Sequence, residues 1–126
     1  MVKIVTWADC GLPPASPILN AATVTKSGII YTSGSVGLAA DGSIPESIEE
    51  QTEIAIKSLE TVLKTAGSSL NSVLKALVFV TDPALIPRMN AVYSKYFTTC
   101  PSRSCVVTAL GSPAFKVEIE LIAEVE

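Results

Sequence analysis

Histidine is absent from the 126-residue sequence, and that absence narrows the chemistry open to the protein. Without histidine, the usual Ser/His and Cys/His nucleophiles and the histidine-dyad sites of ribonucleases are excluded. The three cysteines are an odd number without paired spacing, so neither a disulfide framework nor a structural metal site is expected. Any chemistry must therefore rest on carboxylates, arginine, hydroxyls, thiols, backbone groups or water.

Charged residues are scarce too, at 17% of the chain against a hydrophobic fraction of 48%, and the net charge is -3. No window gathers Lys and Arg residues, so the footprint that attracts phosphates is missing and nucleic acid is not expected as the main partner. Apolar runs stop well short of the roughly 18 residues that indicate a membrane span. Residues 1–10 carry neither a signal-type apolar block nor an Arg-rich amphipathic helix, so we expect a cytoplasmic protein.

What the sequence does contain indicates one α+β domain over residues 1–126. Its patterns predict strands at 2–6, 21–25, 28–33, 73–80, 103–110 and 115–125, helices at 46–66 and 83–97, a proline-rich loop at 10–17 and a glycine-rich bend at 33–37. Residues 111–113 would join the last two strands. Two helices cover only one face of a sheet, so the other face must meet solvent or another subunit. The high apolar fraction favours a subunit.

The helix at 46–66 has the clearest signal, because its apolar residues recur at the spacing of one helix face. Glutamates crowd its first turns and Lys64 lies in its last, the arrangement that the helix dipole favours. Asp82 can cap the second helix, whose first turn should be irregular because it contains Pro87. The strand at 73–80 has almost lost its alternation, which predicts a central strand covered on both faces.

The most specific signal lies near the C-terminus, where charged residues interrupt two apolar strands. The run Pro101-Ser102-Arg103-Ser104-Cys105-Val106, followed by Leu110 and by Val117-Glu118-Ile119, resembles the signature of the Rid family, also called the YjgF/YER057c/UK114 family. The likeness extends over most of the chain, through Tyr31-Thr32-Ser33-Gly34, Val78-Phe79-Val80-Thr81-Asp82 and Asn90.

The resemblance implies a chorismate-mutase-like α+β fold: a mixed β-sheet with two helices on one face, assembled as a homotrimer with ligand clefts between subunits. It also implies hydrolysis of reactive 2-imino acids or enamines, such as 2-iminobutanoate and 2-iminopropanoate, to 2-keto acids and ammonia. No metal and no organic cofactor is implied. By the same resemblance, Arg103 holds the substrate carboxylate and Glu118 positions the hydrolytic water. The family tyrosine expected at 16–20 is replaced, most simply by Ile18.

Six residues are the candidate ligand contacts: Arg103, Cys105, Ser33, Gly34, Ile18 and Asn90. Ser33 and Gly34 could supply a hydroxyl and close backbone approach, or could merely end a strand. Cys105 lies two residues from Arg103 and so on the same face of a strand, but no histidine is present to activate its thiol. Asn90 could contact the ligand or stabilise helix packing.

Several alternatives stay open at this point. From the residues alone, Arg103 could form an interface ion pair with Glu118 or Glu120, which share one face of their strand. The motif favours ligand binding by Arg103 and selects Glu118 rather than Glu120 as the group that activates water. Three functions remain: a deaminase, a non-catalytic binder of small carboxylates or keto acids, and, with less support, an RNA-cleaving translation inhibitor.

Overall fold

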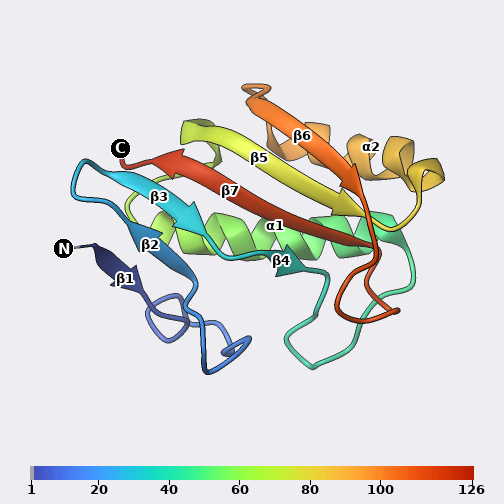
Figure 1. Cartoon of the computed structure of the whole chain (residues 1–126), viewed down its shortest axis with the longest axis horizontal. Coiled ribbons are helices and arrows are strands. Elements are labelled where there is room, and N and C mark those ends of the chain that lie inside the picture. The colour runs from blue at the N-terminus through green and yellow to red at the C-terminus, as the bar shows by residue number, and fades with distance from the viewer. Residues whose placement is uncertain (1) are drawn as a thin grey trace.

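A computed structural model describes residues 2–126 and shows one seven-stranded sheet with both helices on the same face (Figure 1). The strands are β1 (Lys3–Val5), β2 (Ala22–Val24), β3 (Ile29–Thr32), β4 (Ser35–Val36), β5 (Val73–Val80), β6 (Ser102–Val107) and β7 (Val117–Glu124), and the helices are α1 (Ile48–Thr65) and α2 (Ile86–Tyr96). The sheet order is β1-β2-β3-β7-β5-β6, with β4 also paired to β7. Only β5 and β6 run parallel, so the predicted mixed α+β fold is confirmed.

Both predicted helices form, and their ends are fixed by caps. Ser47 caps α1 by accepting a hydrogen bond from the backbone N–H of Glu50, and Gly67 follows the helix with a positive φ of 88°. Asp82 accepts a hydrogen bond from the Ala84 N–H at the start of a short 3-10 turn, Pro83–Leu85. This turn is the expected irregularity, and the α-helix proper begins after it.

The last two strands differ from the prediction in their bounds and in their arrangement. Strand β6 ends at residue 107 and strand β7 begins at residue 117, and the two strands do not form a hairpin. Instead β6 lies at the sheet edge beside β5, and β7 inserts between β3 and β5. The buried side chain of Gln51 fixes this connection, because its Nε2 donates to the Ala114 carbonyl and its Oε1 accepts from the Lys116 N–H.

Where a glycine-rich bend was predicted, the structure has the short strand β4, paired with β7. Gly37 directly after it lets α1 approach closely, since a Cβ atom at this position would lie 2.5 Å from Gln51 Cα. Within residues 2–126 the two-residue strand pairs only with β7, so its other edge has no strand partner. This strand therefore forms because it pairs with the distant strand β7, and not because of a local sequence pattern.

The two faces of the sheet differ in burial. Ile30, Val78, Ile119 and Leu121 face the helices and are buried in one cluster with α1. On the open face, Tyr31 is exposed, and the side chains of β5 that face this way are only half-buried. The prediction that β5 is covered on both faces is therefore wrong for the single chain, because the helices pack on one side only.

No helix within residues 2–126 is long and apolar enough to cross a membrane.

Candidate functional site

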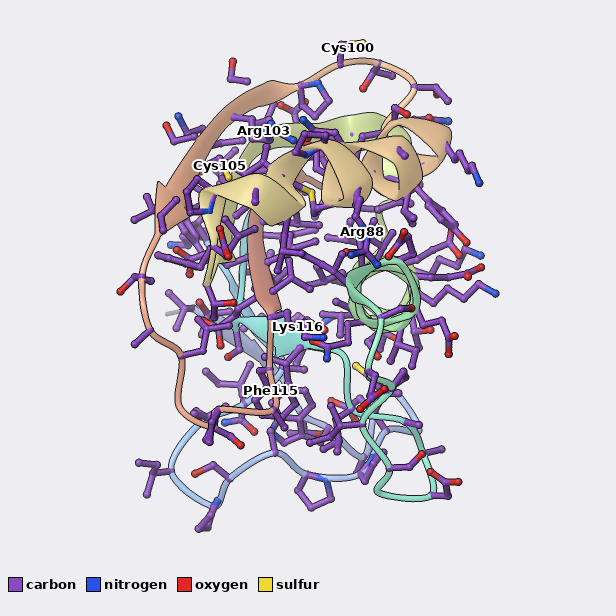
Figure 2. The ribbon with its side chains drawn as sticks, turned by 90° about the vertical axis from the view of Figure 1, so that its right-hand side faces the viewer. Arg88, Cys100, Arg103, Cys105, Phe115 and Lys116 are labelled. Carbon is purple, nitrogen blue, oxygen red and sulfur yellow. The ribbon has the colours of Figure 1, made fainter. Side chains whose placement is uncertain are left out.

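Arg103 lies on β6, at the edge of the sheet, and points to the helix-covered face beside α2 (Figure 2). Its register partner on β5 is the fully buried Ala76, which faces the same way. One guanidinium nitrogen, Nη1, donates a hydrogen bond of 2.7 Å to Oδ1 of Asn90. The guanidinium carbon lies 4.7 Å from the centre of the Tyr93 ring, within the range of a cation–π contact. Two side chains of α2 thus hold this cation.

Arg103 forms no ion pair with a carboxylate anywhere in residues 2–126, where the three salt bridges join other residues. The alternative of an ion pair with Glu118 or Glu120 is therefore absent within the chain. Arginine carries five N–H donors, and only one of them has a protein acceptor here. The remaining fork matches a carboxylate with two parallel hydrogen bonds.

Asn90 and Cys105 lie beside Arg103, but both side chains already contact other residues of the protein. The side-chain carbonyl oxygen of Asn90 accepts the hydrogen bond from the guanidinium and so positions the arginine. Cys105 pairs with Val78 and packs against the core, half-buried on the same face as Arg103. The sequence patterns did not identify Tyr93 as a partner of Arg103. Its spacing of three residues from Asn90 on one helix face was the available signal.

Glu118 lies on β7 and points to the open face, since its neighbours Val117 and Ile119 are buried against the helices. Its carboxyl group lies against Gly34: a Cβ atom there would be 2.9 Å from Glu118 Cδ and 3.0 Å from Oε2. No hydrogen bond to this carboxylate is made within residues 2–126. Burial, and then the negative charge of Glu120, raise the pKa of the Glu118 carboxyl above its ordinary value.

Ser33 directly precedes Gly34, and Ile18 lies in the loop before β2. The hydroxyl of Ser33 donates a hydrogen bond of 2.5 Å to the carbonyl of Asn20, so it ties down the loop that precedes β2. Ile18, in that loop, is 89% exposed and contacts no core cluster. Gly34 is the residue of this group that meets Glu118 directly.

The structure therefore places six of the seven predicted site residues in two groups on opposite faces of the sheet, and the exposed Ile18 belongs to neither. An arginine group consists of Arg103, Asn90 and Cys105, with Tyr93 added. A glutamate group consists of Glu118, Gly34 and Ser33. Strand β5 lies between them, pairing with β6 on one side and with β7 on the other. One chain does not bring the two groups together, so a site that uses both needs a second copy.

Among residues 2–126, no group of three histidine, cysteine, aspartate or glutamate side chains is placed to hold a metal ion.

Comparison with known proteins identifies relatives over the whole domain. The family model described as endoribonuclease L-PSP matches residues 13–125. Protein HMF1 of Saccharomyces cerevisiae is 33% identical over 125 residues, 98% of this chain and 97% of that protein. The chloroplastic Reactive Intermediate Deaminase A of Arabidopsis thaliana is 33% identical over 119 residues, covering 92% of this chain and 61% of that protein. The crystal structure of Escherichia coli TdcF with bound serine superimposes with a TM-score of 0.86 at 28% identity, over 98% of this chain and 99% of that chain.

Proposed function

Because this chain belongs to the YjgF/Rid family, whose model is described as endoribonuclease L-PSP, we propose that it is a hydrolytic deaminase of reactive 2-imino acids. Substrates such as 2-iminobutanoate and 2-iminopropanoate would yield 2-keto acids and ammonia. The observation that carries this proposal is a guanidinium held by Asn90 and Tyr93 with most of its donors unused. The bound serine in TdcF supports a small amino acid-like ligand for a relative of this fold.

In this proposal Arg103 binds the substrate carboxylate. Its planar fork donates two hydrogen bonds to one carboxylate, which fixes the orientation of the attached imine carbon. The cost of ordering the long arginine side chain is already met by its contacts with Asn90 and Tyr93. Carboxylate binding therefore acts as the anchor, and chemistry takes place at the next carbon.

Glu118 would orient and deprotonate the attacking water. The water oxygen bonds to the imine carbon as the C=N π pair moves to nitrogen, and the water's proton passes to Glu118. Glu118 then returns that proton to nitrogen, which gives a carbinolamine. The C–N bond breaks as the hydroxyl proton passes through Glu118 to the departing nitrogen, so that ammonia leaves and the C=O bond forms. A carboxylate without a hydrogen-bond partner and with a raised pKa is a better base than an ordinary surface glutamate.

We further propose that this chemistry takes place between subunits of a homotrimer. The arginine and glutamate groups lie on opposite faces of one chain, so a cleft that holds both requires two copies. Tyr31 at 48% and Val106 at 41% exposure leave apolar surface uncovered on or beside the open face. A closed ring of identical subunits would cover this surface and form equivalent clefts.

Subunit complementation tests the shared site. Arg103→Ala and Glu118→Gln proteins, each inactive alone, are unfolded together and refolded as a mixture. Random mixing should restore about a quarter of the wild-type activity. Half of the clefts receive an intact Arg103 from one subunit, and half of those receive an intact Glu118 from the other. Light scattering gives the mass of the assembly. A mixture that exchanges subunits without regaining activity, or a monomeric wild type, would contradict the shared cleft.

The activity itself is tested with 2-iminobutanoate generated in solution. Wild type should accelerate ammonia release, and Arg103→Ala should lower kcat/KM about 100-fold or more, as expected when a charge-assisted carboxylate contact is lost. Arg88→Ala is the matched control, because Arg88 forms only an exposed ion pair with Glu49 at 2.8 Å. No acceleration by wild type, together with retained binding of a 2-keto acid, would leave the non-catalytic binder.

The description of the family model gives one reason to test RNA cleavage as well. The chain lacks histidine and carries a net charge of -3, and both features favour the deaminase over a nuclease. RNA cleavage by purified protein that survives both Arg103→Ala and Glu118→Gln would support the nuclease. The cytoplasmic location stays a prediction.

A further inference from the structure

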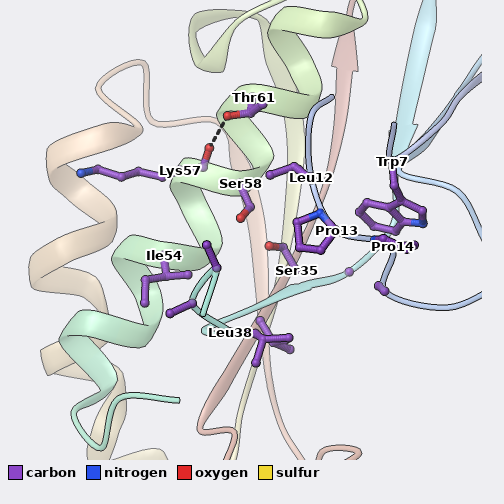
Figure 3. A pocket seen from close by; sticks show the side chains of 15 residues that line it. Trp7, Leu12, Pro13, Pro14, Ser35, Leu38, Ile54, Lys57, Ser58 and Thr61 are labelled. Atoms are coloured by element: carbon purple, nitrogen blue, oxygen red, sulfur yellow. Dashed lines mark hydrogen bonds between the residues drawn. The ribbon is translucent and has the colours of Figure 1, made fainter. Parts of the chain in front are cut away.

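A cavity of about 450 Å³ lies between the N-terminal loop, β4 and α1 (Figure 3). Residues 12–15 form one wall and Ile54 and Ser58 of α1 form another. Trp7 lies at one end, where its indole Nε1 donates a hydrogen bond of 2.9 Å to the Leu19 carbonyl. None of the residues of the arginine group lines this cavity.

The chemistry of the lining indicates an uncharged, largely apolar occupant. Lys57 is the one charged residue of the lining, and its ammonium group points away from the cavity toward an ion pair with Glu53 at 3.4 Å. Ser35 and Ser58 point toward one another across the space. Ser35 Oγ donates a hydrogen bond to the Ala55 carbonyl, while the Ser58 hydroxyl forms no hydrogen bond within residues 2–126. A buried ionised group would find no partner here.

The cavity adjoins the glutamate group through β4. Successive strand residues point to opposite faces, yet Ser35 and Val36 both line the cavity. The cavity therefore extends along β4, although Glu118 itself does not line it. There Val36 is the register partner of Glu118, and Gly34 both lines the cavity and contacts the Glu118 carboxyl.

We propose that this cavity receives the side chain of the substrate, so that the protein prefers 2-imino acids with large, uncharged, apolar side chains. This inference rests on the proposed function, since it places the reacting carbon at Glu118 and the side chain along β4. Small substrates leave the cavity empty, whereas a branched or aromatic side chain buries apolar surface in it. Each added methylene contributes to binding, so several together should give about a tenfold preference.

Hydrolysis of two substrates tests the preference. The imines of leucine and of alanine are generated in solution by an amino-acid oxidase, and kcat/KM is measured for each. Wild type should favour the leucine-derived imine about tenfold or more. Ser58→Leu fills the cavity and should lower the leucine-to-alanine ratio about tenfold. Lys64→Leu places the same side chain on an exposed position of α1 outside the cavity and should leave the ratio unchanged.

A binding measurement keeps the inference separate from the catalytic proposal. Trp7 is the single tryptophan of the chain and lines the cavity, so its fluorescence reports occupancy directly. Addition of 4-methyl-2-oxopentanoate should change the emission saturably in wild type and not in Ser58→Leu, whereas pyruvate should have little effect. If no imine is hydrolysed, the catalytic proposal fails and this titration alone decides the inference. An unchanged Trp7 signal, or a wild type that favours the alanine-derived imine, would overturn the inference.

Discussion

The arginine group and the glutamate group are built in opposite ways. Arg103 is held from two sides, by a hydrogen bond to Asn90 and by the ring of Tyr93. The Glu118 carboxylate accepts no hydrogen bond within residues 2–126, and its surroundings are Gly34, partial burial and the Glu120 charge. A cation fixed in advance binds an anion at little entropic cost, whereas burial and the Glu120 charge keep the pKa of the Glu118 carboxyl raised.

The sharpest test of the comparison removes the charge of the unsupported carboxylate. Glu118→Gln keeps the shape of the side chain but cannot accept a proton, so we expect kcat to fall about 100- to 10,000-fold, the usual contribution of a general base. Glu120→Gln, two residues away on the same face, is the matched control and should change kcat less than about fivefold at neutral pH. Equal losses in both variants would show that neither carboxylate has a special role.

Two neighbouring glycines should separate folding from function. A Cβ atom at Gly37 meets the backbone of α1, 2.5 Å from Gln51 Cα, and backbone cannot yield easily. Gly37→Ala should therefore lower the free energy of unfolding by about 3 kcal/mol, the cost of overpacking. Urea unfolding measures this loss.

At Gly34 the obstacle is the movable end of Glu118, with 2.9 Å between the added Cβ and Cδ. Gly34→Ala should cost less than about 1 kcal/mol in urea unfolding, while kcat falls about tenfold because the carboxylate is displaced. A large loss of stability in Gly34→Ala, or unchanged stability in Gly37→Ala, would contradict the geometry.

The support of Arg103 is tested at Tyr93. Tyr93→Leu removes the ring beneath the guanidinium and should raise KM about fivefold with little change in kcat, in line with the size of a cation–π contact. Tyr93→Phe keeps the ring and should keep KM. Phenylalanine should even raise the free energy of unfolding slightly, because the buried Tyr93 hydroxyl has no hydrogen-bond partner in residues 2–126. A KM raised equally by both substitutions would assign the effect to the hydroxyl.

The smallest expected effect concerns the pH dependence of Glu118. A general base works when deprotonated, so kcat should rise with pH through the Glu118 pKa, which lies above its ordinary value. The Glu120 charge contributes to that increase, so Glu120→Gln should lower the Glu118 pKa and move the acid limb of the kcat profile to lower pH. A shift to higher pH would contradict the electrostatic origin.

Local pattern was sufficient wherever one element's own residues decide its conformation. The helix at α1 was predictable because its cap, its acidic first turn and its apolar face are all contained in one stretch. The face of Glu118 was predictable as well, since strict alternation along β7 buries its neighbours. Strand β6 offers a weaker contrast, because none of its residues is fully buried, so the direction of Arg103 was open.

Residue identity and short-range spacing were enough to predict both helices, most of the strands, the chemical types at the site and the family motif. Only the tertiary structure decided that β7 separates β3 from β5, that Gln51 secures the connection across 63 residues to Ala114, and that a cavity runs beside β4. It also decided that Arg103 and Glu118 lie on opposite faces of one sheet. The physical reason is that pairing between distant strands depends on how the whole chain buries its apolar surface, and no local window contains that information.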